Sequence, residues 1–463
     1  MTKKRLFYFA LGALLSVTSC SQEDVVRENP ESGGKRITFR ASLPELSTRA
    51  SEINSSNLNN FRVSCFIEGE NTLTPYFVDK LFSKQGNRYV SSDPDCVWPD
   101  DNSRLKFIAF TPSCADMRKL GNFSETDFSL TPVKVGVAEA LNYKLENFKV
   151  AKDIAKQIDF VTATVAGNVP DNEETGIKLN FRHQLSRIEI KAWGANESYD
   201  IEIAGVRIGG VEVEGIFNFI PSADANSEGA DGFRVSGSKG CVEYIFSNGD
   251  NLITLDRGAD SPSSDGKAVS IMGSKIGEGE GYDNSAMLIP ANNINWDYEN
   301  DRGNAGVNGN PPGSYLSVLL RVTDATNNSL GNPVYPYLNN PDNMEVVCLA
   351  VDKATKKEVK TRLYKQGGSY FSDPSFNTPY DLSANAAEVK EFGWAALPIS
   401  GNWQPGTVYT YTLNYSNGVG LREPTDPTHP GESIIGDNVI VNVEMSEWQR
   451  KPENSSDVSV PRK

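Results

Sequence analysis

The residue best suited to covalent chemistry in this chain is Cys20. It follows an apolar stretch, residues 6–17, and a basic triplet, residues 3–5, precedes that stretch. A basic segment followed by about a dozen apolar residues is typical of a signal peptide, because such a stretch is too short to span a bilayer as a helix. A thiol at the end of the stretch is well placed to receive a lipid. We therefore expect removal of residues 1–19 and lipidation of Cys20.

A second site for covalent chemistry is the peptide bond between Arg49 and Ala50. Both residues lie in a polar segment, residues 47–57, that is rich in Ser and Asn. Segments of this composition are exposed and are preferred sites of proteolysis. We predict proteolytic processing after Arg49. The alternative is an ordinary exposed loop in which this arginine has no role.

Side chains for acid–base catalysis are scarce. The chain has only two histidines, His183 and His429. It contains no nucleophile elbow, no zinc-binding HExxH motif and no phosphate-binding glycine motif. His183 follows a segment with strand-like alternation, which favours a structural role near a domain junction over a catalytic one. We therefore expect no catalytic residue and no enzymatic activity.

One acidic segment, residues 297–303, spaces its carboxylates as calcium loops do. The glycine that an EF-hand needs at the sixth position is Arg302 here, so a solvated loop is favoured over a metal site. No metal and no cofactor are expected. Trp296 is the candidate for stacking on a sugar. The tryptophans beside strand signals are predicted to be core residues: Trp98, Trp394, Trp403 and Trp448.

The charge balance and the cysteines limit the partners and the cross-links. The chain has 60 acidic against 45 basic residues, and its formal charge is −15. Such a field repels phosphate backbones, so nucleic acid is not expected as a partner. Five widely spaced cysteines follow Cys20, and an odd number cannot form a closed disulfide framework. Most are predicted to be buried thiols: Cys65, Cys96, Cys114, Cys241 and Cys348.

The elements that position these residues are predicted to be strands. The chain contains 39 Gly, 25 Pro, 21 Phe and 17 Tyr, a composition that favours many short strands joined by turns. Only residues 138–156 have helical spacing, with Leu141, Leu145, Phe148 and Ile154 on one face. We therefore predict an all-β chain with a single helix at that position.

Two strands at opposite ends of the chain have matching patterns. Apolar and polar residues alternate in residues 36–43 and again in residues 439–446, which is the period of a strand with one buried face. The apolar positions of the leading strand are Ile37, Phe39, Ala41 and Leu43. The apolar positions of the C-terminal strand are Val439, Val441, Val443 and Met445.

A series of short motifs runs through the chain in a fixed order. No single motif is specific, but the order and spacing together resemble those of the fimbrillins and fimbrillin-like lipoproteins of Bacteroidetes. The resemblance covers nearly the whole chain after the signal peptide. The motifs occupy residues 37–39, 47–50, 98–99, 105–112, 159–161, 179–186, 287–290, 398–399, 403–406, 409–413 and 439–448.

The resemblance implies two transthyretin-like β-sandwich domains in tandem, which we divide at residue 185. The N-terminal sandwich then comprises residues 36–185, and the C-terminal sandwich comprises residues 186–450. A lipidated N-terminus and tether, residues 20–35, precede them, and a polar tail, residues 451–463, follows.

The resemblance also implies a mechanism of assembly. In that family, cleavage after an arginine in the position of Arg49 releases the leading strand together with the lipid. An extended strand from another chain then fills the open groove by β-strand addition. The alternation in residues 439–446 suits such a donor strand. The alternative is that this strand completes the sheet of its own chain.

We therefore expect a structural or adhesive subunit of a cell-surface fimbria, acting as stalk, tip or anchor. Residues 21–24 are similar to the acidic signal that sends Bacteroidetes lipoproteins to the outer face of the outer membrane. The expected partners are other fimbrial subunits, the outer membrane through the lipid, and a host or bacterial surface ligand. The alternative is a monomeric surface lipoprotein that binds a glycan or host ligand through its loops.

Overall fold

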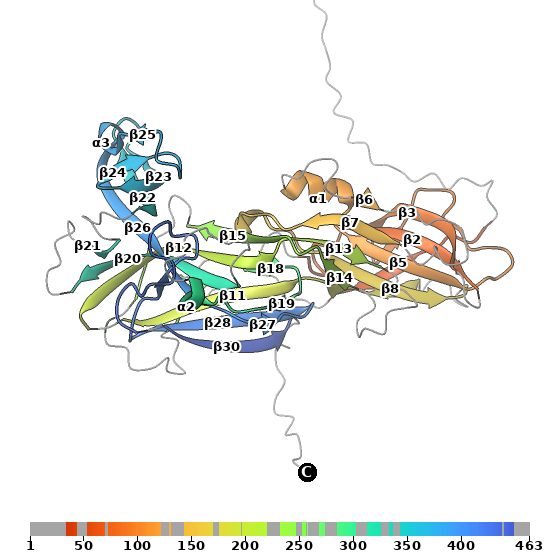
Figure 1. The fold of residues 1–463 in the computed structure, drawn as a ribbon. Coiled ribbons are helices and arrows are strands. Elements are labelled where there is room, and N and C mark those ends of the chain that lie inside the picture. The colour runs from red at the N-terminus through yellow and green to blue at the C-terminus, as the bar shows by residue number, and fades with distance from the viewer. Residues whose placement is uncertain are drawn as a thin grey trace, which may run out of the picture.

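The computed structural model of the chain consists almost entirely of strands (Figure 1). The predicted all-β class is confirmed. No helix in the part of the chain that the structure describes is long and apolar enough to cross a membrane. The described residues are 34–43, 53–69, 73–121, 129–130, 143–169, 176–195, 197–219, 232–246, 252–255, 257, 268–273, 285–301, 313–325, 333–336, 343–437 and 439–448.

The N-terminal strands form one eight-stranded sheet, which lies at one end of the elongated molecule (Figure 1). In order across the sheet, the strands are β10 (Arg182–His183), β8 (Val161–Gly167), β5 (Leu105–Thr111), β2 (Asn60–Glu68), β3 (Leu73–Gln85), β4 (Arg88–Val90), β1 (Phe39–Ser42) and β9 (Ile177–Asn180). The last of these strands, β9, also lies beside β8, so the sheet curls around a core of its own.

A second, four-stranded sheet covers the other face of β2 and β5. Phe66 on β2 and Phe110 on β5 belong to the same buried cluster as Phe148 and Phe217 of this sheet. Between the layers, the hydroxyl groups of Ser64 and Tyr143 are hydrogen-bonded at 2.6 Å. The strands are, in order, β14 (Gly232–Val235), β13 (Glu214–Asn218), β7 (Lys144–Lys149) and β6 (Ser129–Leu130).

The predicted helix over residues 138–156 is wrong in its described part. Residues 144–149 form β7, and only a 3-10 turn, η1 (Ile154–Lys156), follows. Leu145 pairs with Phe217, and Phe148 pairs with Gly215. An advance of three residues along β7 therefore lies opposite an advance of two residues along β13. This β-bulge, with Asn147 at a positive φ of 55°, places residues three apart on one face of a strand. Apolar residues three positions apart are also typical of one face of a helix, which is why the sequence predicted a helix here.

A second pair of sheets makes up the other end of the molecule (Figure 1). Their inner faces share one buried cluster, to which Ile190, Ile203, Leu320 and Tyr411 belong. The smaller sheet runs β17 (Val269–Met272), β11 (Ser186–Ala195), β28 (Thr407–Tyr415) and β30 (Ile440–Glu447), and β18 (Ala286–Leu288) also pairs with β11. The larger begins with β15 (Lys239–Ile245), β12 (Tyr199–Glu212), β20 (Tyr315–Asp324) and β26 (Ala386–Pro398), beside which lie β16 (Ile253–Thr254), β21 (Pro333–Tyr335) and β29 (Leu421–Arg422).

The larger sheet continues into an arm that projects from the sandwich (Figure 1). β26 runs through both parts, because its later residues pair with β20 and its earlier residues pair with β22. The arm contains β22 (Met344–Asp352), β23 (Glu358–Gln366), β24 (Ser369–Phe371), β25 (Pro379–Tyr380) and α3 (Leu382–Asn385). The remaining elements are α1 (Cys114–Gly121), α2 (Tyr298–Asp301), β19 (Asn292–Asn293) and β27 (Gly401–Asn402).

Candidate functional site

The leading strand β1 is an interior strand of the N-terminal sheet. It pairs antiparallel with β4 through Phe39 and Tyr89, and parallel with β9 along all four of its residues. No other strand joins β4 to β9 in the described sheet. Removal of β1 would therefore leave both neighbours with unpaired backbone groups along a gap one strand wide.

Phe39 fills the centre of this gap. Its ring is fully buried and makes edge-to-face contacts with Phe61, Phe82 and Phe107, with centroid distances of 6.1, 4.9 and 5.2 Å. Ile37 and Leu43, on the same face of the chain, are also buried, and Ala41 is half-buried. The groove beneath β1 is thus lined with aromatic side chains that need an apolar cover.

Further contacts fix both ends of β1. The Arg36 guanidinium donates to the carbonyls of Ser91 and Asp93, and the Ile37 N–H donates to the Cys96 carbonyl at 3.1 Å. At the other end, the Phe181 N–H donates to the Ser42 carbonyl. The segment is therefore held as a structural strand in the intact chain.

The C-terminal strand β30 lies at the open edge of the smaller sheet of the second pair of sheets. It pairs antiparallel with β28 from Thr407–Glu447 to Asn414–Ile440, and no described strand lies on its other side. An edge strand presents unpaired N–H and C=O groups, so it is a natural place for pairing between chains. Here β30 completes the sheet of its own chain.

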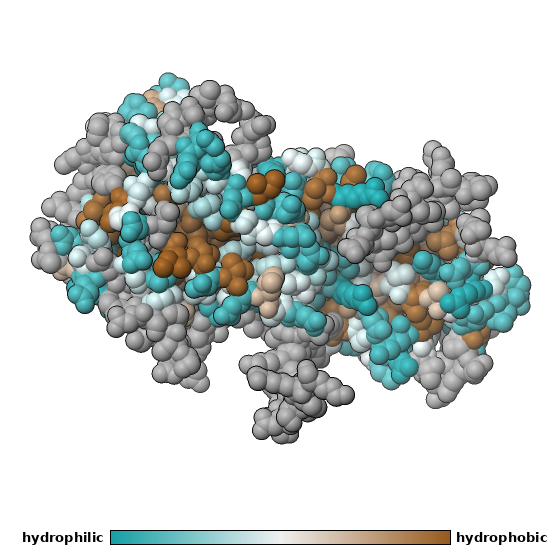
Figure 2. Space-filling model, turned by 60° about the horizontal axis from the view of Figure 1, so that its bottom comes forward, coloured by the Kyte–Doolittle hydropathy of each residue, from teal (hydrophilic) through white to brown (hydrophobic). Residues whose placement is uncertain are grey.

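The apolar face of β30 differs from the half-buried pattern that its sequence predicts. Val439 is buried and Val441 half-buried, but Val443 and Met445 are 46% and 72% exposed. They pair with the buried residues Tyr411 and Tyr409, so they lie on the inner face of the sheet although they are exposed at its edge. This side of the second sandwich shows a hydrophobic patch (Figure 2). Exposed apolar patches on a sheet edge are typical of interaction surfaces.

β30 ends at a joint between the two pairs of sheets. Its chain continues into Trp448, which is buried and stacks face to face on His183 of β10, with ring centroids 4.1 Å apart. The Trp448 N–H donates to the carbonyl of Gly406 at 2.8 Å. Gly406 has a positive φ of 66°, and a Cβ there would lie 3.3 Å from the His183 carbonyl oxygen. A glycine in this turn therefore brings β28, β30 and β10 together.

His183 is a buried structural residue at this junction. Its Nδ1 is hydrogen-bonded to Oδ2 of Asp159 at 2.9 Å, and both side chains are almost fully enclosed. The stacked Trp448 covers the ring. Asp159 was not predicted as the partner of His183, although residues 159–161 are among the family-like motifs.

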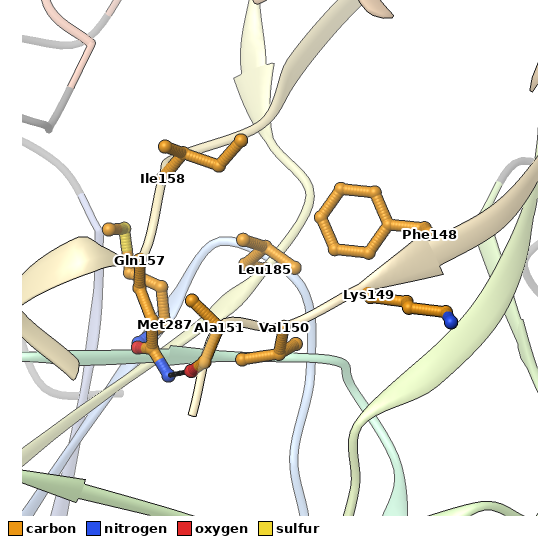
Figure 3. Close-up of a pocket in the computed structure, with 8 residues that line it drawn as sticks. All are labelled: Phe148, Lys149, Val150, Ala151, Gln157, Ile158, Leu185 and Met287. Atoms are coloured by element: carbon orange, nitrogen blue, oxygen red, sulfur yellow. Dashed lines mark hydrogen bonds between the residues drawn. The ribbon is translucent and has the colours of Figure 1, made fainter. Parts of the chain in front are cut away.

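No organic ligand fits the small cavity that described residues form at the junction between the sheets. One small cavity of about 10 Å³ lies where the sandwiches meet and is lined by Phe148, Val150, Leu185 and Met287, among others (Figure 3). Gln157 closes it: its Nε2 donates to the Ala151 carbonyl at 3.0 Å and its Oε1 accepts from the Met287 N–H at 2.7 Å. Such a volume holds at most one water molecule.

The predicted sugar-stacking residue is not available for that role. Trp296 is only 1% exposed and packs against Tyr298 and Tyr315, so the prediction for it is wrong. Asp297 caps the short helix α2 by accepting from the backbone and side chain of Asn300. No group of three or more metal-binding side chains occurs among the described residues.

The core predictions for the other tryptophans and for several cysteines are confirmed. Trp98, Trp394, Trp403 and Trp448 are all buried. All five cysteines in the described residues are free, and Cys65, Cys96 and Cys348 are buried. Burial raises the pKa of the Cys114 thiol to about 11 and that of Cys348 to about 12. These thiols are therefore unreactive near neutral pH.

Three of the predicted processing residues lie outside the described residues. These are the lipidation site Cys20 and the pair Arg49 and Ala50. The described chain stops at Leu43 and resumes at Ile53, on either side of the predicted cleavage point. What the structure contributes to their role is the placement of the strand that precedes them.

Comparison with known proteins identifies the family. A sequence-family profile described as fimbrillin-like matches residues 48–293, which is more than half of the chain. The chain belongs to the fimbrillin-like family. The predicted resemblance is thereby confirmed, and membership implies a cell-surface fimbrial location. No curated protein sequence matches the chain.

Several solved structures from Bacteroidetes are similar to this fimbrillin-like chain. A candidate cell adhesion protein from Bacteroides ovatus is 11% identical, with 90% of this chain and 99% of that chain covered and a TM-score of 0.36. One from Parabacteroides distasonis is 10% identical, with 91% and 99% covered and a TM-score of 0.36. A third, from Bacteroides eggerthii, is 12% identical, with 90% and 97% covered and a TM-score of 0.33.

Proposed function

We propose that this fimbrillin-like protein is a structural or adhesive fimbrial subunit that is exported as a lipoprotein and assembled by protease-triggered donor-strand exchange. The observation that carries the proposal is the placement of β1 as the single link between β4 and β9. A strand in that position can leave a ready-made groove, because Phe61, Phe82 and Phe107 are held by other strands. Cleavage after Arg49 would free β1 together with the lipid on Cys20.

The donor in this proposal is β30 of a neighbouring subunit. Its apolar face carries four side chains, each worth about 1.5–3 kcal/mol on full burial, or about 6–12 kcal/mol gross. The ordering of the strand and the loss of its pairing with β28 offset part of this gain. Because Val443 and Met445 are exposed in the free subunit, transfer into an aromatic groove gains burial that the home sheet does not provide.

We also propose the sequence-derived division into residues 36–185 and 186–450 as two transthyretin-like sandwiches. The eight-stranded sheet ends at His183, and β11 of the second pair of sheets begins at Ser186, which supports a boundary near residue 185. β13 and β14 follow that boundary, yet they pair with β7 beside the first sheet. In this proposal, β13 and β14 belong to the second sandwich in sequence but pack with the first sandwich.

The assembly test uses purified mature protein treated with an Arg-specific protease. Wild type is expected to form SDS-resistant ladders, and Arg49→Ala is expected to remain monomeric because β1 stays in place. Val443→Asp is expected to block assembly, because a carboxylate in the aromatic groove costs several kcal/mol. It should leave monomer melting unchanged, because Val443 is exposed there.

The matched control is Asn442→Asp. It adds the same charge to the opposite face of β30 and should still assemble. Ladders from Val443→Asp equal to those of wild type would reject β30 as the donor. Ladders from uncut Arg49→Ala would reject the processing step and favour a monomeric ligand-binding lipoprotein that associates by other contacts.

Lipidation is tested separately by metabolic labelling with a fatty-acid probe. Wild type is expected to be labelled and Cys20→Ser is not, because the thiol at the end of the apolar stretch is the acceptor. Cys65→Ser serves as the matched control and should keep the label, because that thiol is buried in the core. Equal labelling of wild type and Cys20→Ser would contradict export as a lipoprotein.

A further inference from the structure

β30 is held mainly at its two ends. Between Ile440 and Glu447 most of its side chains are exposed, and its backbone pairs with β28 alone. At the two ends, Val439 is 8% exposed and Trp448 is 2% exposed. An edge strand with few buried side chains opens easily by local unfolding, so these end contacts determine how long it stays in place.

The contact at Trp448 is built from several interactions. The indole stacks on the imidazole of His183 with an interplanar angle of 3°. The guanidinium of Arg187 lies over the same indole at 5.7 Å, and the Trp448 N–H is bonded to Gly406. His183 and Arg187 flank the boundary between the sandwiches, so the end of β30 is anchored on the first sandwich as well as on its own.

The histidine of this stack is connected to the chain that follows the proposed cleavage point. Oδ2 of Asp159 is 2.9 Å from Nδ1 of His183 and also accepts from the backbone N–H of Ile53 at 3.0 Å. The Ile53 N–H can only donate, so this oxygen of Asp159 is its acceptor. One oxygen therefore orients His183 and holds Ile53 at the same time.

Two enclosed polar atoms of this joint, Oδ1 of Asp159 and Nε2 of His183, have no hydrogen-bond partner among the residues that the structure describes. Unsatisfied buried polar atoms are rare in native proteins and destabilise the fold.

We propose that Asp159, His183 and Trp448 form a clasp that retains β30 in its own sheet and responds to the position of the chain at Ile53. While Ile53 is bonded to Asp159, the carboxylate is fixed and the imidazole is held flat beneath Trp448. Loss of the Ile53 contact lets the carboxylate turn, the imidazole loses its fixed plane, and the stack loosens. The biological meaning of the clasp rests on the proposed function: processing a few residues before Ile53 would open the groove and also ease release of the donor strand.

The test is hydrogen exchange of the full unassembled chain, read by mass spectrometry on the amides of the β28–β30 ladder. Trp448→Ala is expected to speed exchange of these amides by about tenfold or more, because the stack and the burial of the indole are lost. Ile53→Pro removes the backbone donor and is expected to speed exchange by about threefold or more. The double variant is expected to match Trp448→Ala alone, because both changes act on one contact.

Met445→Ala is the matched control, because its side chain is exposed on the same strand, and it should leave exchange unchanged. Should Ile53→Pro disturb the β2–β5 ladder, Asp159→Leu removes the shared acceptor instead and should speed β30 exchange in the same way. Unchanged β30 exchange in a folded Ile53→Pro or Asp159→Leu variant overturns the clasp, as do additive effects in the double variant. The readout is the monomer, so it is independent of whether the subunits polymerise.

Discussion

At the scale of single residues, Arg207 shows how this acidic protein accommodates charge inside a sheet. Its guanidinium binds the carboxylates of Glu243, Glu345 and Glu423 at 3.0, 2.9 and 2.8 Å. It also lies over the Trp394 ring at 3.9 Å. Burial raises the pKa of the Glu423 carboxyl above its ordinary value although Arg207 lowers it. Removing this guanidinium would leave the three carboxylates without the cation that they share.

Replacement of Arg207 by Leu is expected to lower the free energy of unfolding by about 3–5 kcal/mol, because Glu423 would remain buried without a cation. Denaturant unfolding measures the change. Arg234→Leu is the control: that side chain is exposed, and the expected change is within about 0.5 kcal/mol. Equal effects of the two substitutions would show that the Arg207 network contributes nothing specific.

At the scale of elements, β1 and β30 share a sequence pattern but differ in how the fold uses it. β1 is enclosed between two strands, and its apolar face covers aromatic rings. β30 has one neighbour, and half of its apolar face is exposed. The first strand is therefore a stabilising part of its sheet, and the second is only loosely retained.

Phe39→Ala is expected to destabilise the chain by about 3–5 kcal/mol, because a fully buried ring with three aromatic neighbours leaves a cavity. Arg40→Ala, on the exposed face of the same strand, should change stability by less than about 0.5 kcal/mol. Thermal or denaturant unfolding of the uncut protein checks both. A small effect of Phe39→Ala would mean that the groove collapses without β1, which would argue against a lasting acceptor site.

At the scale of the whole molecule, one of the buried clusters continues from the first pair of sheets into the second. This cluster includes Phe66 and Phe110 of the first sheet, Phe217 of β13 and Trp448 at the end of β30. Phe160 contacts Phe217 at 5.0 Å, across the proposed boundary. Shared cores couple the unfolding of the parts that contribute to them.

Calorimetry of the uncut protein is therefore expected to show one cooperative unfolding transition, with calorimetric and van't Hoff enthalpies in agreement. Phe217→Ala should lower the midpoint of the whole transition, because it removes packing that both parts use. Two separate transitions, with only one of them moved by Phe217→Ala, would show instead that the sandwiches unfold independently.

The sequence by itself determined the class of the protein. Period-2 alternation fixed the strand character of residues 37–43 and 440–447, because a strand with one buried face needs that pattern whatever surrounds it. The order of the short motifs indicated the fimbrillin-like family. Most tryptophans were correctly predicted as core residues, because large apolar rings beside strands are rarely left in water.

Only the tertiary structure decided which alternating strand is enclosed and which lies at an edge, because the same pattern serves both positions. It also replaced the expected helix by β7, where the bulge at Asn147 gives Leu145 and Phe148 a helical spacing. The contacts of Asp159 with Ile53, and of His183 with Trp448, join residues 106 and 265 positions apart. Local periodicity carries no information about such pairs, because they form only when the chain closes on itself.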